Sequence, residues 1–214
     1  MKAIRALVAI VAALGLFATG IVANAATTQT TQSRHQLDPA FCRVLNDGAR
    51  AFVAANPGSK DPTVTLFRNG LRLATDTNCY SETTMQVVRP QAAAIAKLLG
   101  TTTASADGCW HGWPSQNYYW AGLIYVGYTY IGFSGCWVTN QLVTSQWGPD
   151  SGGSFIYPYQ LTRDWWGYTT GSPANPLTAG LNFHVQACLA YCGPSYWGDQ
   201  RDSLYNNGTL YQYN

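Results

Sequence analysis

Residues 118–131, YYWAGLIYVGYTYI, decide the fold of this chain. Aromatic and β-branched side chains fill the stretch without a single charge, which favours extended strands, and we predict one long strand or two strands with a break near Gly127. The same composition continues over residues 109–214, which contain all 8 tryptophans, 13 of the 14 tyrosines and no lysine or glutamate. The six charged residues of this segment are Asp150, Asp164, Asp199, Asp202, Arg163 and Arg201.

The rest of this segment has the residue pattern of a half-buried sheet. Apolar side chains alternate with polar ones over residues 181–189, which is typical of a strand with one buried face. Asn207-Gly208 predicts a type I′ hairpin turn near the C-terminus. Further strands are predicted at residues 136–144, 154–159, 161–169, 202–205 and 209–213. We therefore predict that residues 109–214 form an all-β domain, an antiparallel β-sandwich of jelly-roll-like type.

The first residues have the pattern of an export signal. A short positive start precedes an apolar run at residues 6–22, and Ala23-Asn24-Ala25 is the small-residue pattern that signal peptidase recognises. A membrane anchor is the alternative, but the run is shorter than the roughly 20 apolar residues of a spanning helix. We predict a signal peptide over residues 1–25, a disordered linker over residues 26–37, and a secreted, extracellular mature protein without a membrane span.

Helix signals follow this linker. Asp38-Pro39 combines an N-cap acceptor with a proline at the first helical position. Residues 63–75 fit either a helix or a hairpin, and we lean to the helix. A third helix is predicted at residues 90–99. Together these elements predict a small helical segment over residues 38–100, joined to the β domain by a polar linker over residues 101–108.

All six cysteines lie beyond the predicted signal peptide. An even number of cysteines in an exported chain predicts disulfides. Cys42 and Cys79 are placed to tie the first two N-terminal elements together, whereas the pairing of the others stays open. The spacing of the cysteines matches no tetrahedral zinc pattern, so we predict neither a metal site nor a cofactor. The other four cysteines are Cys109, Cys136, Cys188 and Cys192.

Three polar residues are candidates for hydrolytic chemistry. Ser151 lies in an Asp-Ser-Gly-Gly stretch that resembles the nucleophile motif of chymotrypsin-like serine proteases. The upstream part of the chain has no room for that family's first barrel, so we interpret the stretch as a turn. His184 on a strand face and Asp164 beside two tryptophans are possible bases or acids. A secreted hydrolase that uses Asp164 or His184 with Ser151 is an alternative function, and it requires these side chains to converge.

Aromatic rings are the stronger functional signal. Trp and Tyr present an apolar body with a polar tip, which suits them to stack on sugar rings. Most of them must also serve as core residues. Trp165 and Trp166 are neighbours in a predicted strand and therefore point to opposite faces. The ligand-binding candidates are Trp165, Trp166, Trp110, Trp113, Tyr196 and Trp197, together with Tyr118 and Tyr119.

A set of cysteine and tryptophan motifs spans the β domain. The motifs are Cys109-Trp110, Cys136-Trp137, Trp165-Trp166, Phe183 to Cys188, Cys192 and Asn207-Gly208-Thr209. On these residues the domain resembles a group of uncharacterised secreted bacterial proteins, actinobacterial in style, with disulfide-bonded β-rich domains. The resemblance implies the disulfides Cys136–Cys188 and Cys109–Cys192, and it implies no reaction.

Charge and composition narrow the choice of partner. The formal net charge is +2, and no basic residues cluster into a stripe that nucleic acid would require. We predict a secreted, non-catalytic binding module whose ligand is a glycan or another cell-envelope component. A structural or interaction protein of the cell surface is a further alternative, and it requires a large exposed apolar patch. The oligomeric state stays open.

Overall fold

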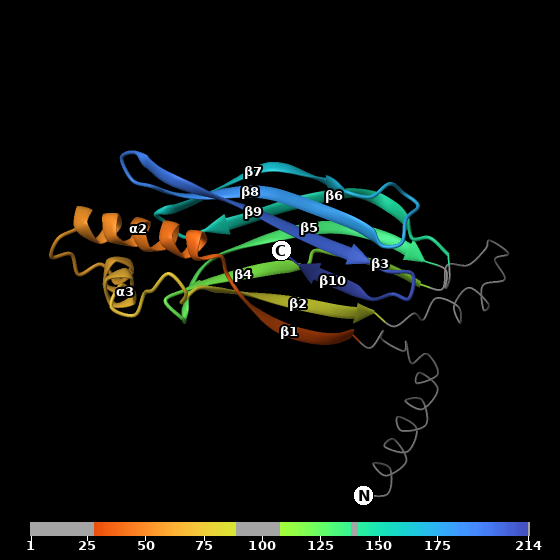
Figure 1. The fold of residues 1–214 in the computed structure, drawn as a ribbon, viewed down its shortest axis with the longest axis horizontal. Helices are drawn as coiled ribbons and strands as arrows, with labels where there is room; N and C mark the ends of the chain where they lie inside the picture. Colours follow the sequence, from red (N-terminus) through yellow and green to blue (C-terminus); the bar gives the residue numbers. More distant parts are fainter. Residues whose placement is uncertain (1–27, 89–107, 138–140, 214) are drawn as a thin grey trace, which may run out of the picture.

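The computed structural model describes residues 28–88, 108–137 and 141–213 as two antiparallel sheets packed face to face, with a pair of helices at one end (Figure 1). The first sheet consists of β1 (Thr28–Gln36), β2 (Tyr80–Val88), β3 (Gly108–Gly112), β4 (Ser115–Trp120), β5 (Ile124–Trp137) and β6 (Thr144–Phe155). The second sheet consists of β7 (Tyr159–Tyr168), β8 (Leu177–Cys188), β9 (Cys192–Leu204) and β10 (Leu210–Tyr213). The predicted β-sandwich with a helical segment before it is confirmed.

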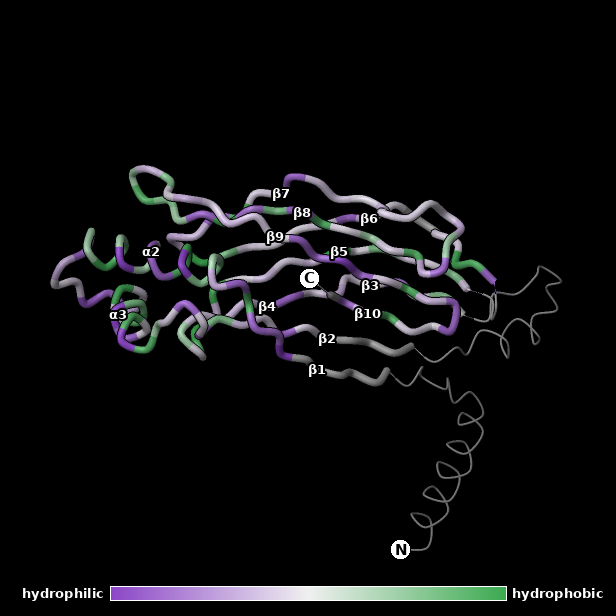
Figure 2. Tube along the Cα trace, in the orientation of Figure 1, coloured by the Kyte–Doolittle hydropathy of each residue, from purple (hydrophilic) through white to green (hydrophobic). Residues whose placement is uncertain are grey.

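Strand β5 is the centre of the first sheet. It pairs with β4 and then β3 along one edge and with β6 along the other, so that Tyr130 lies between Ser115 and Gly152. The second sheet has the order β10-β9-β8-β7. Most strands are pale in Figure 2, because tyrosine, glycine, serine and threonine are neither strongly hydrophilic nor strongly hydrophobic. The sheets are therefore built from residues that suit both a core and a surface.

Both helices begin at an aspartate N-cap, and the first of these is the predicted Asp38. Asp38 accepts a hydrogen bond from the Ala40 amide at the start of α2 (Pro39–Ala55), and Asp61 caps α3 (Pro62–Gly70) in the same way. Of the two readings of residues 63–75, the helix is correct. Both helices alternate between hydrophobic and hydrophilic residues in Figure 2, which lets one side of each pack against the protein.

Helix α2 covers one end of the sandwich, at the left of Figure 1. The Phe41 ring lies 5.5 Å from Tyr118 and 4.9 Å from Tyr196, so that one helix residue contacts both sheets. Trp120 Nε1 donates a hydrogen bond of 2.7 Å to Asn46 Oδ1. These contacts join the helix pair and the sandwich into a single core.

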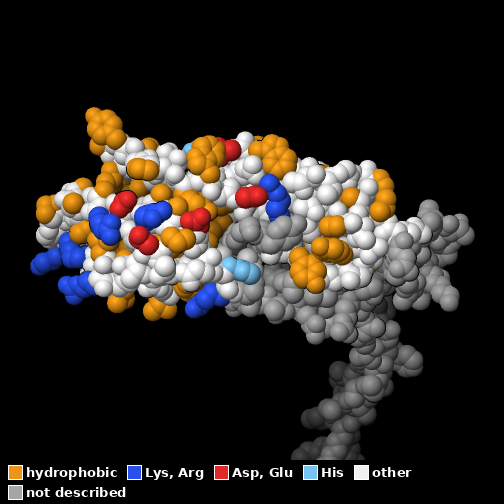
Figure 3. Space-filling model, in the orientation of Figure 1, with side chains coloured by type: hydrophobic (Ala, Val, Ile, Leu, Met, Phe, Trp, Pro, Cys, Tyr) orange, Lys and Arg blue, Asp and Glu red, His pale blue; other side chains and the backbone are white. Residues whose placement is uncertain are grey.

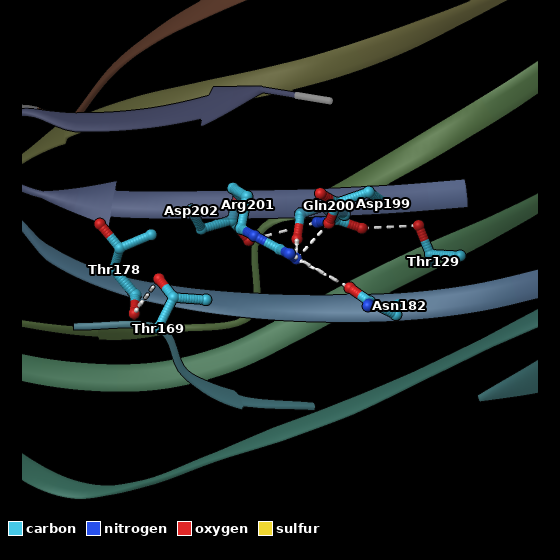
Figure 4. A network of polar contacts seen from close by, with 8 residues as sticks. All are labelled: Thr129, Thr169, Thr178, Asn182, Asp199, Gln200, Arg201 and Asp202. Atoms are coloured by element: carbon cyan, nitrogen blue, oxygen red, sulfur yellow. Dashed lines mark hydrogen bonds and ion pairs between the residues drawn. The ribbon is translucent and has the colours of Figure 1, made fainter. Parts of the chain in front are cut away.

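A chain of buried polar side chains crosses the interior between the two sheets. Its members, bonded in sequence, are Ser81, Gln116, Tyr118, Thr129, Gln200 and Asp202. Thr129 Oγ1 on β5 donates to Gln200 Oε1 on β9 over 2.6 Å, and this bond joins the sheets (Figure 4). Asp202 Oδ2 accepts from Gln200, whereas Asp202 Oδ1 is buried without a hydrogen-bond partner among the described residues. Hydroxyls and amides thus replace part of the usual apolar core.

Two N-terminal predictions are wrong. Residues 28–36, expected to be a disordered linker, form β1, and residues 80–88, expected within the helical segment, form β2. The two strands pair over nine positions, and β2 pairs with β4. Backbone hydrogen bonds to a neighbouring strand order this polar stretch, and its own composition does not reveal that neighbour. The β-sandwich therefore includes residues before position 109.

Several strand boundaries and turns also differ from the predictions. The break expected near Gly127 lies at Ala121-Gly122, where both residues have positive φ. Residues 136–144 are not one strand, because β5 ends at Trp137 and β6 begins at Thr144. The predicted hairpin near the C-terminus exists, but only Gly208 has positive φ, so the turn is not type I′. Its loop has three residues instead of two, and it closes with a hydrogen bond from the Tyr205 amide to Thr209 O.

The disulfides confirm one prediction and correct two. Cys42–Cys79 is present as predicted, although it ties α2 to the residue before β2 and not to the second helix. The pairs implied by the resemblance are wrong, because the structure has Cys109–Cys136 and Cys188–Cys192. In both cases the strand register places the two cysteines directly opposite each other, with 4.0 Å between their Cα atoms. Register, which the motif spacing did not reveal, therefore determines the connectivity.

Some predictions fall on residues outside the described part of the chain. These are the signal peptide at residues 1–25, the helix at residues 90–99 and nearly all of the linker at residues 101–108. In the part of the chain that the structure describes, no helix combines the length and apolar character needed to cross a membrane.

The contact of α2 with the sandwich makes Gly48→Ala destabilising. A glycine inside a helix normally costs about 1 kcal/mol relative to alanine, so this substitution would stabilise a free helix. Here the new Cβ would lie 2.5 Å from Ala187 Cβ and 2.6 Å from Tyr159 Cε1. We expect the free energy of unfolding to fall by about 1–3 kcal/mol in urea titrations. Asp47→Ala, on an exposed side of the same helix, is the control and should change it by less than about 0.5 kcal/mol.

Asp202 should make the protein less stable as pH rises. Burial raises the pKa of the Asp202 carboxyl well above its ordinary value, and the hydrogen bond from Gln200 offsets only part of this rise. The folded state therefore holds the proton more tightly than the unfolded state, and stability is lost as pH rises above about 4 toward the raised pKa. Asp202→Asn keeps an acceptor for Gln200 without the charge. We expect urea unfolding to show this variant more stable than the wild type at pH 8 by about 1 kcal/mol or more, with less difference at pH 4. An equal effect at both pH values would contradict the account.

Candidate functional site

An open groove lies on the outer face of the first sheet, over β4 and β5. Its volume is about 460 Å³. No lysine, arginine, aspartate or glutamate is among its lining residues, which are Trp113, Ser115, Asn117, Tyr125, Tyr128 and Tyr130. The groove is therefore an aromatic and amide-bearing surface with hydroxyl groups, and we call it the tyrosine groove.

The strand pattern turns these side chains outward. On β4, Gln116, Tyr118 and Trp120 are buried between the sheets, so Ser115 and Asn117 face outward. Asn117 pairs with Tyr128, and Ser115 pairs with Tyr130, which places the tyrosines of β5 on the same outer face. The bend at Ala121-Gly122 precedes Tyr125, which is exposed at the end of the groove.

Glycines beneath the rings give the groove its shape. A Cβ at Gly132 would lie 2.1 Å from Trp113 Cδ1, and a Cβ at Gly152 would lie 2.4 Å from Tyr130 Cε1. Both rings therefore lie directly on the backbone of the sheet, where any side chain other than hydrogen would displace them. Tyr128 and Tyr130 are nearly parallel, with 19° between their planes and 6.4 Å between their centroids.

Five side chains of the groove have polar atoms that are available to a ligand. Within the described residues, the side chains of Ser115, Asn117, Tyr125, Tyr128 and Tyr130 make no hydrogen bond to one another or to other groups. Partial burial, together with the neighbouring Tyr128, raises the pKa of Tyr125. The Tyr125 hydroxyl therefore keeps its proton at neutral pH and can donate a hydrogen bond.

The tyrosine groove continues toward the second sheet. A second section of about 300 Å³ shares Tyr128 and Tyr130 with the first and extends over Gly152 and Gly153 of β6. Leu161 and Arg163 of β7 line its far end. The two sections form one elongated surface that crosses from the centre of the first sheet to the nearest strand of the second.

The outer face of the second sheet carries another group of rings. Trp165 and Trp197 are exposed there, the latter to 63%, and His184 lies between their strands. Figure 3 shows exposed hydrophobic side chains beside acidic and histidine side chains along the upper edge of the molecule. The polar groups of this face bond one another: His184 Nδ1 lies 3.0 Å from Asp164 Oδ2.

The neighbouring charges on this face are also engaged. Arg201 forms an ion pair with Asp199 and donates to Asn182 Oδ1 over 3.1 Å (Figure 4). The Arg201 guanidinium lies 5.8 Å from the Trp165 ring centroid. Because these groups satisfy one another, this face has less hydrogen-bonding capacity to offer than the tyrosine groove.

The structure divides the predicted ligand contacts between surface and core. Trp113, Trp165, Trp166 and Trp197 are exposed. Trp110 is 3% exposed and Tyr118 is equally buried, so neither can contact a ligand in this fold. Tyr196 is half-buried and packs against Phe41 of the core. Tyr119 faces outward and stacks on Tyr80, with 4.9 Å between the ring centroids.

Sequence reasoning missed five of the six groove residues, among them the three tyrosines Tyr125, Tyr128 and Tyr130. The strand that contains them was predicted, but aromatic or apolar residues occupy both of its faces, so the sequence does not show which face is buried. Only the pairing with Asn117 and Ser115 shows which side faces outward.

The side chains required for the hydrolase alternative do not meet. His184 and Asp164 lie together on the outer face of the second sheet. Ser151 is fully buried on β6, and its Oγ has no hydrogen-bond partner among the described residues. The same part of the chain contains no cluster of three or more histidine, cysteine, aspartate or glutamate side chains arranged to hold a metal ion.

Comparisons with protein-family models, curated proteins and solved structures found no match to this chain.

The close approach of Tyr130 to Gly152 gives a direct test of the groove. In Gly152→Ala the new methyl group would meet the far end of the half-buried Tyr130 side chain, so we expect this ring to swing away at a cost of about 1 kcal/mol. The ¹⁹F spectrum of protein labelled with 3-fluorotyrosine should show one displaced resonance. Gly148→Ala, on the same strand with nothing within 4 Å, is the control. An unchanged spectrum in Gly152→Ala would show that the ring does not lie on the sheet.

Proposed function

We propose that the protein is an exported, non-catalytic binding module that holds a glycan chain in the tyrosine groove. The observation that carries the proposal is a row of exposed and half-buried rings on a sheet face, where the tyrosine, serine and asparagine side chains have no hydrogen-bond partner in the described structure. Aromatic rings stack on the apolar faces of sugars, and the surrounding amides and hydroxyls bond sugar hydroxyls.

The form of the groove favours a chain over a compact ligand. Small-molecule sites usually enclose most of the ligand surface, whereas the tyrosine groove is open along the sheet. Its two sections are joined through Tyr128 and Tyr130. A linear polymer of sugars can occupy such a surface with several residues at once, each contributing a modest part of the affinity.

Export fits both the chemistry of the cysteines and the start of the chain. Three disulfides account for all six cysteines, and such bonds persist in oxidising environments outside the cytoplasm. The Ala23-Asn24-Ala25 pattern after an apolar run supports cleavage of a signal peptide. A glycan of the cell envelope or its surroundings is the ligand class to which an exported module has access.

The proposal predicts that loss of a groove ring weakens glycan binding. Affinity electrophoresis in native gels with embedded hydroxyethylcellulose, xylan or polygalacturonate should retard the wild type with at least one of them. We expect Trp113→Ala and Tyr125→Ala each to weaken that binding about tenfold, because one stacking contact contributes about 1 kcal/mol or slightly more. Both side chains are exposed, so unfolding midpoints should change little.

Trp197→Ala is the matched control, because it removes an equally exposed ring from the other sheet. It should bind as the wild type does. Loss of binding in Trp197→Ala with full binding in Trp113→Ala would place the site on the second sheet and contradict the proposal. If no polysaccharide retards the wild type, while sedimentation shows self-association, the structural or interaction protein becomes the better account.

A further inference from the structure

We propose that the glycan held in the tyrosine groove is acidic, and that Arg163 binds its anionic groups at the β7 end of the groove. This inference rests on the proposed function and names the substrate class of the same site. The anionic group is a carboxylate or a sulfate ester, since a guanidinium bonds either with two parallel hydrogen bonds.

Arg163 is the one charged residue that lines the described groove. The aromatic section has no ionisable side chain other than tyrosine, and the section beyond Tyr130 adds Arg163. A chain lying along the rings would therefore reach a guanidinium after passing Gly152 and Gly153, where the absence of side chains keeps the path open. The charge of the groove is positive at one end and neutral along the rest.

The guanidinium of Arg163 is positioned by two contacts. Its Nη1 donates to the backbone oxygen of Ser151, and its Cζ lies 5.0 Å from the Trp166 ring centroid. A hydrogen bond to a neutral carbonyl and a ring contact hold the group without neutralising its charge. Several of its five N–H donors stay free for a ligand.

Arg163 also lacks an ion-pair partner in the described residues. Arg34, Arg50 and Arg201 are paired with Glu82, Asp47 and Asp199. No described carboxylate pairs with Arg163, although Asp164 follows it directly. The register shift of β7 between Arg163 and Trp165 places Asp164 with His184 on the outer face of the second sheet. The groove end therefore keeps an unpaired cation.

Two carboxylates lie on the same face as the groove: Glu82 of β2, opposite Asn117, is paired with Arg34, whereas Asp150 has no ion-pair partner among the described residues. Asp150 of β6 is opposite Gly132, two positions from Gly152, and its Oδ1 accepts from the Ser151 amide over 2.7 Å. Its charge opposes the approach of an anion to Arg163. Removal of this carboxylate should therefore strengthen binding of an acidic chain, whereas removal of Arg163 should weaken it.

The experiment compares acidic and neutral forms of the same polymers. Polygalacturonate is paired with fully methyl-esterified pectin, and dextran sulfate with dextran, which separates a carboxylate from a sulfate requirement. We expect the wild type to bind at least one acidic form about five to ten times more tightly than its neutral form, as for a partly exposed ion pair of about 1 kcal/mol. Arg163→Met should abolish this preference, so that the acidic form binds no more tightly than the neutral form. Asp150→Asn should increase the preference.

Arg201→Met is the matched control, because it removes an arginine that contacts a tryptophan on the other sheet. It should keep the full preference. Arg163→Lys retains the positive charge but not the paired N–H donors of the guanidinium, so it should keep part of the preference for the acidic form. This variant keeps the inference testable if Arg163→Met fails to fold. Equal loss of acidic and neutral binding in Arg163→Met, with Arg163→Lys equal to the wild type for both, would make the residue structural and overturn the inference.

The two proposals fail in different ways. A wild type that binds acidic and neutral forms equally, with both dependent on Trp113, would overturn the acidic substrate and leave the glycan-binding function in place. A wild type that binds none of these four polymers but is retarded by xylan or hydroxyethylcellulose would also overturn only the acidic substrate. A wild type that binds none of the six polymers, or binds them without dependence on Trp113, would overturn both.

Discussion

An aromatic ring can lie flat on a β-sheet only where the strand beneath it has no side chain, and this constraint shapes the candidate site. Gly132 and Gly152 lie on neighbouring strands of the first sheet and accept the rings of Trp113 and Tyr130. The rings cover the backbone and leave an open aromatic surface between them. A residue with a Cβ at either glycine would raise the ring and close the path along the strands. The site is thus built mainly on the sheet, and the connection between β3 and β4 adds Trp113 to it.

The interior between the sheets also contains polar side chains. Thr129 and Gln200 bond across the gap between the sheets, and Asp202 ends the buried chain with one unpartnered oxygen. A core that relies on hydrogen bonds in place of part of its apolar contact requires precise register. Three disulfides and the docking of α2 supply additional constraints on that register. The rigid sandwich in turn holds the outer rings at fixed spacing, so that little ordering is needed when a chain binds.

Composition and the alternation of apolar and polar residues were enough to predict the sandwich. The alternation at residues 181–189 and the uncharged aromatic run at residues 118–131 both favour strands in a sheet. These features were not enough for β1, because its sequence is polar without an apolar alternation and it forms a strand by pairing with β2. The same limit applied to the site. Trp113 and Trp110 are only three positions apart in the sequence, but Trp113 is 54% exposed whereas Trp110 is 3% exposed. Which ring faces outward depends on pairing partners far along the chain, and a single sequence does not reveal them.

The central claim is that the outer face of the first sheet binds a glycan chain. Its most direct test is chemical-shift mapping by NMR of the ¹⁵N-labelled protein during titration with an oligosaccharide of polygalacturonate. The account predicts that the shifted amides cluster on β4, β5 and β6 and extend to Arg163, with the indole resonance of Trp113 among them. Shifts confined to the outer face of β8 and β9 around Trp197, or an unchanged spectrum at saturating oligosaccharide, would contradict it.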